Sequence, residues 1–381
     1  MEEEFQKLSL SLRTFKVKKK RNSSFELLRI ILMTLIVLHH TYLGNKYIRM
    51  LDYKKITLWK YITLKVLSNY GPFANNVFIM ISGHFSVSKI NFNIHKFLSI
   101  LFEIYIYYYP SIFFGKKLKK KYKNFKFPNY KSKEIYFPII SSSSGNWFAQ
   151  IYLSLILFFP YINNGLMSLN RKKYKNLVII IIFFYCIFNS IIKFYGVNSI
   201  VFEDTHLIKL LLPYIIGGYI CLYMSKNKIW IIIGLIFFPL TILLEIVSDF
   251  AFIRYKYNKF VLLKSLLFYE MNSIFSIIGS IGIIYLFKNI SFYNKAVNWI
   301  AASSFAIYLI HGNKNISSYI HNIWFPINNI HSNFFFFKYF IKTVLIVIIC
   351  ILIDILRRYT IGLLFENIIK KLIIKYNKFF I

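Results

Sequence analysis

The chain of 381 residues is basic and apolar, with 48 Lys and Arg against 14 Asp and Glu, a net charge of +34, and 57% hydrophobic residues. Scarce Gly, Pro and Cys exclude a collagen-like repeat and a disulfide scaffold, and the scarcity of acidic residues excludes a disordered acidic chain. The charges fall in clumps between long apolar runs, which argues against a soluble nucleic-acid-binding protein. The composition therefore indicates a polytopic membrane protein without a nucleic-acid partner.

Apolar runs that could cross a bilayer recur along the whole chain. A spanning helix needs about 20 mostly apolar residues. We therefore predict an all-α, polytopic integral membrane protein with one transmembrane domain, 25–356, between a basic N-terminal segment, 1–24, and a basic tail, 357–381. About ten transmembrane helices are predicted, at 25–43, 66–87, 97–115, 147–163, 177–195, 206–224, 229–248, 272–287, 296–312 and 335–356, and 258–270 could be an interfacial helix.

The orientation of the spans follows from Lys and Arg in short loops, which mark the cytoplasmic side. The segment KVKKKR (16–21) places the N-terminus in the cytoplasm. The apolar stretch that follows it is expected to be an uncleaved signal anchor. An even number of spans returns the C-terminal tail to the same side, so we expect a multi-pass protein of the cell membrane. One predicted loop disagrees, since 116–133 carries nine lysines and the span count places it outside.

The first predicted span holds the most informative charge. A charged side chain within a span costs about 2.5–3.5 kcal/mol on insertion scales, so its presence indicates a function. Arg29 and His40 are eleven residues apart, which places them on one face of a helix with about 16 Å of rise between them. Arg29 would lie near the cytoplasmic end and His40 near the outer end. Glu26 lies one turn before Arg29 and can orient it.

The chemistry of arginine and of histidine suggests different roles for Arg29 and His40. A guanidinium at the inner end suits an anionic phosphate, and a histidine deeper in the membrane suits proton transfer. His311, which ends the apolar run 306–311, would lie at the same outer depth as His40. The alternative is that Arg29 extends to the lipid headgroups and that the histidines are packed interfacial residues.

Other polar residues in the predicted spans have simpler interpretations. His84 is predicted to be structural, and Glu103 is as readily a protonated or paired carboxylate as a catalytic one. Asp354 is followed by Arg357 and Arg358 at the spacing of a local ion pair. The sequence contains no Cys-x-x-Cys or HExxH motif, so we expect no metal.

Five segments, in order, resemble the acyltransferase 3 family of membrane O-acyltransferases, in its branch that modifies cell-wall polysaccharides. The first is ELLRIILMTLIVLHH, which contains Arg29 and His40. The resemblance covers about residues 22–356. The other segments are NNVFIMISGHF (75–85), NWFAQIYLSLILFFPYIN (146–163), LPYIIGGYI (212–220) and SSFAIYLIH (303–311).

The resemblance implies an enzyme that transfers an acyl group, usually acetyl from acetyl-CoA, to a hydroxyl of a cell-envelope polysaccharide or its lipid-linked precursor. It implies that activity depends on Arg29 and His40, and His311 matches a histidine that closes a later span. Many members carry an Arg-x-x-Arg pair after the second span, where this chain has Lys89, His95 and Lys96.

The resemblance further implies a standalone enzyme or one with a separate extracytoplasmic partner, because no fused hydrolase-like domain is seen. Two other classes stay open from the residues alone. One is a transporter that exports a glycan or lipid intermediate without chemistry. The other is a receptor or structural membrane protein.

Overall fold

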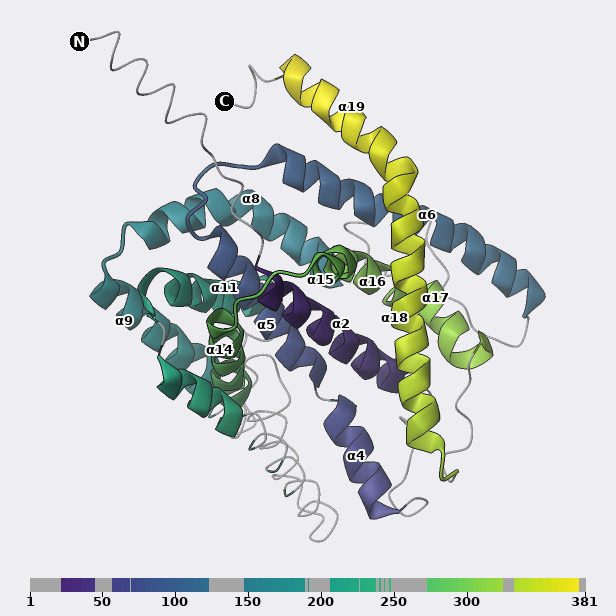
Figure 1. Cartoon of the computed structure of the whole chain (residues 1–381), viewed down its shortest axis with the longest axis horizontal. Helices are drawn as coiled ribbons and strands as arrows, with labels where there is room; N and C mark the ends of the chain where they lie inside the picture. The colour runs from purple at the N-terminus through teal and green to yellow at the C-terminus, as the bar shows by residue number, and fades with distance from the viewer. Residues whose placement is uncertain are drawn as a thin grey trace.

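A computed structural model describes residues 22–44, 57–68, 70–122, 147–188, 206–225, 227–237, 273–324 and 332–376, with single residues at 191, 240, 243 and 247. Every regular element within these ranges is a helix, which confirms the all-α prediction (Figure 1). The predicted features at KVKKKR (16–21) and 258–270 lie outside the described residues.

The helices follow one another in the order of the predicted apolar runs. They are α2 (Ser23–Gly44), α4 (Leu58–Ser68), α5 (Tyr70–Ser86), α6 (Ile94–Lys121), α8 (Trp147–Met167), α9 (Arg171–Ile182), η3 (Phe183–Phe188), α11 (His206–Tyr223), α14 (Ile274–Asn289), α15 (Lys295–Ala301), α16 (Ser304–His311), α17 (Lys314–Tyr319), η5 (Ile320–Trp324), α18 (Phe335–Tyr359) and α19 (Ile361–Tyr376).

Three of these helices, α2, α6 and α18, are long and apolar enough to cross a membrane. Three further apolar helices in the described part of the chain are shorter, at Leu207–Tyr223, Lys228–Phe237 and Ile274–Asn289. The count of ten spans stays a prediction, because parts of several predicted spans lie outside the described residues.

Two local predictions were wrong. The run 296–312 is not one helix: a turn at Ala302 and Ser303, closed by a bond from the Ser303 N–H to the carbonyl of Ile300, divides it into α15 and α16. The lysine-rich segment 116–133 is not a loop throughout, because its residues up to Lys121 are the last turns of α6. Hydropathy alone does not reveal a turn within an apolar run or a helix that continues into charged residues.

Polar caps explain where several helices begin. The side chain of Asn93 accepts a hydrogen bond from the N–H of Lys96 at 2.8 Å, and Asn170 accepts one from Lys173 at 2.9 Å. Such caps satisfy N–H groups that have no partner within the helix. The start of α2 has both a cap and a tertiary bond: the Asn22 side chain accepts from the N–H of Ser24 at 3.1 Å, and the Ser24 hydroxyl donates to the carbonyl of Phe287 at 2.9 Å.

The helix α2 lies in the middle of the molecule and contacts α4, α5, α14, α15, α16 and α18 (Figure 1). Its residues Leu28, Leu32 and Val37 are buried in the main hydrophobic core. Residues on different faces of α2 therefore meet different helices, and the polar residues of its sequence are held within the protein.

The helices α5 and α11 pack with their backbones in close approach. A Cβ atom on Gly83 of α5 would collide with the carbonyl of Tyr214, and one on Gly217 of α11 would collide with the carbonyl of Met80. Small residues allow this approach between membrane helices, where packing replaces the hydrophobic effect as the source of association. This pair supports one side of α2.

The helices α18 and α19 follow each other end to end and cross α6 (Figure 1). The predicted basic tail thus contains a helix. Its Phe365 stacks on Phe102 of α6 with ring centroids 3.4 Å apart and an interplanar angle of 7°.

Replacing Gly217 with alanine tests the close approach of α5 and α11. We expect Gly217→Ala to lower the thermal unfolding midpoint of the detergent-solubilised protein, because overpacking of this kind costs about 1–3 kcal/mol. Gly165→Ala is the matched control, since a Cβ there has no atom within 4 Å. Equal midpoints for the two variants would contradict the packing described.

Candidate active site

A cavity of about 300 Å³ lies between α2, α5, α6, α8 and the α15–α16 turn. From α2 it is lined by Arg29, Met33 and Ile36, whose spacing of four and three residues follows one face of a helix. His40 is the next member of this series. The predicted common face of Arg29 and His40 is therefore confirmed, and it borders a cavity.

Arg29 is held at one end of this cavity by Glu26. The guanidinium Nη1 donates to Glu26 Oε1 at 2.6 Å, as predicted from their spacing. The Glu26 side chain is 4% exposed and that of Arg29 is 24% exposed. A buried carboxylate thus orients a partly accessible arginine, which keeps further donors of its planar fork for another acceptor.

His40 and His311 contact each other, as the predicted common depth suggested. The Nδ1 of His40 and the Nε2 of His311 are 2.9 Å apart, and the ring centroids are 5.0 Å apart. His311 is buried at the end of α16, and Tyr308, one turn before it, lines the cavity. The pair therefore lies about one turn beyond the cavity's lining on both α2 and α16.

The hydrogen bonds of His311 determine which nitrogen of His40 is free to take a proton. The Nδ1 of His311 bonds to the carbonyl oxygen of Ile307, which can only accept, so this nitrogen carries the proton. In neutral His311 the Nε2 is then an acceptor, and His40 Nδ1 must donate to it. The lone pair of neutral His40 is left on Nε2.

Lys96 is a second cation at the same cavity. Its ammonium donates to the hydroxyl of Tyr152 on α8 at 3.3 Å, and both side chains line the cavity with Arg29. The sequence drew attention to Lys96 only through its place after the second predicted span. Tyr152 was missed, although it lies within the recognised segment 146–163.

The turn between α15 and α16 forms another part of the cavity wall. Ala302, Ser304 and Phe305 line the cavity, so the N-terminus of α16 lies at its wall, and Ser303 before it makes no side-chain capping bond. The Ser304 hydroxyl is buried and has no hydrogen-bond partner among the described residues. A helix N-terminus carries partial positive charge and favours anions.

An ion network between α6 and α18 reaches the cavity through Glu103. Asp354 forms the predicted pairs, at 2.7 Å with Arg357 Nη2 and 3.1 Å with Arg358 Nε. Glu103, which lines the cavity, pairs with Arg357 at 3.3 Å, and the Tyr107 hydroxyl donates to Asp354 at 2.7 Å. Glu103 therefore has an ionic partner, which agrees with one of the three predicted alternatives, the paired carboxylate.

The remaining candidates are structural or are not brought to this site. His84 stacks on Phe25 with ring centroids 5.2 Å apart, in agreement with its predicted structural role. In the described part of the chain, no group of three or more His, Cys, Asp or Glu side chains is arranged to hold a metal ion.

Two of the helices around the cavity, α2 and α6, are long and apolar enough to cross a membrane. The cavity is lined by an arginine and a lysine, and a histidine pair lies one turn beyond it, so the fold and site are those of a membrane protein with a polar site among its helices. The sequence model of one family, described as "Acyltransferase domain", matches residues 22–355, which is most of the chain. The chain therefore belongs to the acyltransferase 3 family, and the protein is a membrane acyltransferase. No curated protein and no solved structure matches it.

Removing the carboxylate at the centre of the ion network should destabilise the protein. Asp354 is fully buried, so Asp354→Ala leaves Arg357 and Arg358 without their shared partner, a change that costs about 3–5 kcal/mol for buried pairs. We expect a large fall in the thermal unfolding midpoint. Glu366→Ala is the control, because its pair with Lys370 is exposed and 3.8 Å long. Similar midpoints for both variants would refute a structural role for the network.

Proposed function

We propose that the protein transfers an acyl group, acetyl in the simplest case, from acyl-CoA to a hydroxyl of a cell-envelope polysaccharide or its lipid-linked precursor. The enzyme would act in the cell membrane with both termini in the cytoplasm. The observation that carries this proposal is the order of groups along α2: Arg29 with Glu26 at one end of the cavity, and the His40–His311 pair just beyond the other end.

The Arg29 end of the cavity suits the phosphates of the donor. Three sources of positive charge line this cavity: Arg29, Lys96 and the N-terminus of α16. The Ser304 hydroxyl adds a hydrogen-bond donor. Arginine offers a planar fork to phosphate and lysine a point charge. Lys96 would take the place of the Arg-x-x-Arg pair found in many members of the family.

The histidine end suits the transfer step. His40 Nε2 would take the proton of the acceptor hydroxyl as its oxygen attacks the thioester carbonyl carbon. The carbon–sulfur bond then breaks, and the departing thiolate takes the proton back from His40. His311 would stabilise the transient imidazolium, because its Nε2 accepts from His40 Nδ1, as the orienting group does in serine hydrolase triads.

The central test is His40→Ala in membranes supplied with acetyl-CoA and extracted envelope glycan. We expect acetyl transfer to fall about 10²–10⁴-fold, the usual contribution of general acid–base catalysis. His95→Ala is the control, because this α6 histidine does not line the cavity. Undiminished acetyl transfer by His40→Ala at normal protein levels would contradict the proposal, as would glycan export by the wild-type protein without thioester consumption.

Two replacements of His311 separate its positioning role from mere packing. The amide oxygen of His311→Gln can still accept from His40 Nδ1, whereas His311→Leu offers no acceptor. We expect the glutamine variant to lose about tenfold in kcat and the leucine variant a further tenfold or more, with KM for acetyl-CoA little changed in both. Equal activities of the two variants, at equal thermal stability, would show that His311 does not act through this bond.

A further inference from the structure

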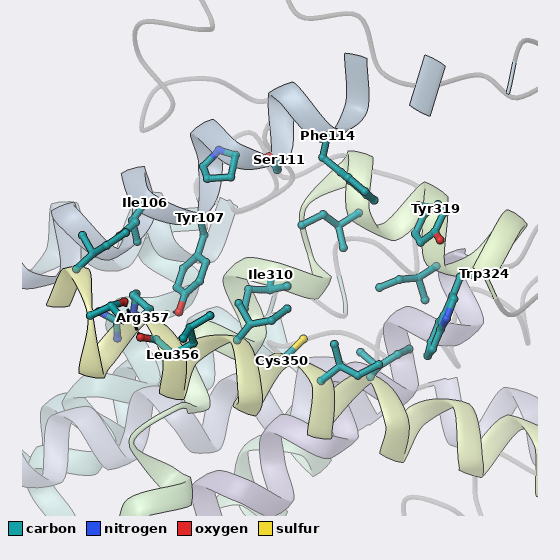
Figure 2. A pocket seen from close by; sticks show the side chains of 18 residues that line it. Ile106, Tyr107, Ser111, Phe114, Ile310, Tyr319, Trp324, Cys350, Leu356 and Arg357 are labelled. Carbon is teal, nitrogen blue, oxygen red and sulfur yellow. Dashed lines mark hydrogen bonds between the residues drawn. The ribbon is translucent and has the colours of Figure 1, made fainter. Parts of the chain in front are cut away.

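A second and larger cavity, of about 740 Å³, lies between α6, α18 and the segment formed by α16, α17 and η5 (Figure 2). Its size is within the range of ligand sites in proteins. Its lining is almost entirely apolar, and it shares no lining residue with the cavity at Arg29. Typical lining residues are Ile106, Phe114, Ile310, Trp324, Ile349 and Ile353.

This apolar cavity lies directly beside the histidine pair. Ile310, which precedes His311 in the chain, lines the cavity, and Figure 2 shows Ile310 and Cys350 in its middle part. Two of its walls, α6 and α18, are helices of membrane-spanning length. The medium at this depth is hydrocarbon, which is as apolar as leucine side chains, so the occupant should be a hydrocarbon chain.

The two ends of the apolar cavity differ in charge. At one end are Tyr107 and Arg357, and the charge of Arg357 is matched by Asp354 and Glu103. At the other end α6 continues beyond Phe114 into five exposed lysines within about 10 Å of helix. Those lysines are Lys116, Lys117, Lys119, Lys120 and Lys121.

The lysine-rich end of α6 favours an anionic headgroup. A lysine ammonium binds phosphate as a point charge, so five lysines close together attract the phosphate of an anionic lipid. The span count places this end of α6 on the outer side, which is also where His40 and the acceptor hydroxyl would meet. An apolar cavity and a cationic end together match a long-chain lipid phosphate.

We propose that this cavity holds the hydrocarbon chain of the lipid phosphate that carries the acceptor glycan, with the phosphate at the lysines of α6. The inference rests on the proposed function, in which the acceptor is either a polysaccharide or its lipid-linked precursor. It selects the lipid-linked precursor. A hydrocarbon chain bound beside Ile310 raises the local concentration of the attached sugar near His40, because the reaction of the tethered sugar is then effectively intramolecular.

Photolabelling of the full-length protein in phosphatidylcholine nanodiscs tests this site. The probe is a polyprenyl phosphate that carries a diazirine in its chain. Ile349→Trp fills the cavity, whereas Ile348→Trp does not, although the two neighbours on α18 are similarly exposed, at 39% and 45%. We expect about tenfold less labelling of Ile349→Trp and normal labelling of Ile348→Trp. A second pair, Ile353→Trp and Leu352→Trp, should behave in the same way if Ile349→Trp fails to fold.

Competition experiments then define the ligand. Unlabelled polyprenyl phosphate should displace the probe, whereas polyprenol and phosphatidylglycerol should not. Equal labelling of the paired variants would overturn the proposal, and so would equal competition by phosphatidylglycerol, which would mark an ordinary lipid contact.

Acetyl-CoA consumption by the wild-type protein is measured in the same nanodiscs, to separate the two proposals. Consumption without site-dependent labelling would overturn only the lipid site. Absence of consumption, with a lipid-linked or a soluble glycan supplied, would overturn the proposed function instead.

Discussion

The constraint on which this structure depends is that ionisable groups at membrane depth must have partners. Arg29 is paired with the buried Glu26, Asp354 binds two arginines, and His40 is bonded to His311. Each partner comes from the same helix one turn away or from a helix packed against it. A buried ion that loses its partner is expensive, so these contacts restrict how α2, α16 and α18 can be arranged.

The same constraint gives the site its order. The helix α2 presents Arg29, Met33, Ile36 and then His40 along one face, so an apolar wall joins the end with the arginine to the end with the histidine. In the proposed function these two ends bind the anion and transfer the proton. The turn at Ala302 and Ser303 adds a helix N-terminus where the positive groups gather, and α16 then carries His311 to His40. Interrupted helices of this kind are tolerated in membranes where they border a protein cavity. The proposed transfer, from a donor on one side of the membrane to an acceptor on the other, would use this order of groups.

Sequence spacing predicted the parts of the site that lie on one helix. The eleven-residue interval placed Arg29 and His40 on one face, and the one-turn intervals predicted the pairs of Arg29 and Asp354. Shared predicted depth also anticipated the contact of His311 with His40. Spacing could not predict the turn that divides 296–312, the contact of Lys96 with Tyr152, or the apolar cavity, because each depends on how separate helices pack. The helix α19 was missed because its basic composition suggested a tail.

The central claim is that one cavity receives the donor phosphates at Arg29 and delivers the acyl carbonyl to His40. The most direct test is electron cryo-microscopy of the protein in nanodiscs with a thioether analogue of acetyl-CoA, which cannot transfer its group. The account predicts phosphate density in contact with Arg29 and Lys96 and the analogue's carbonyl carbon beside His40 Nε2. Density for the analogue at another surface, with the Arg29 cavity empty, would contradict it.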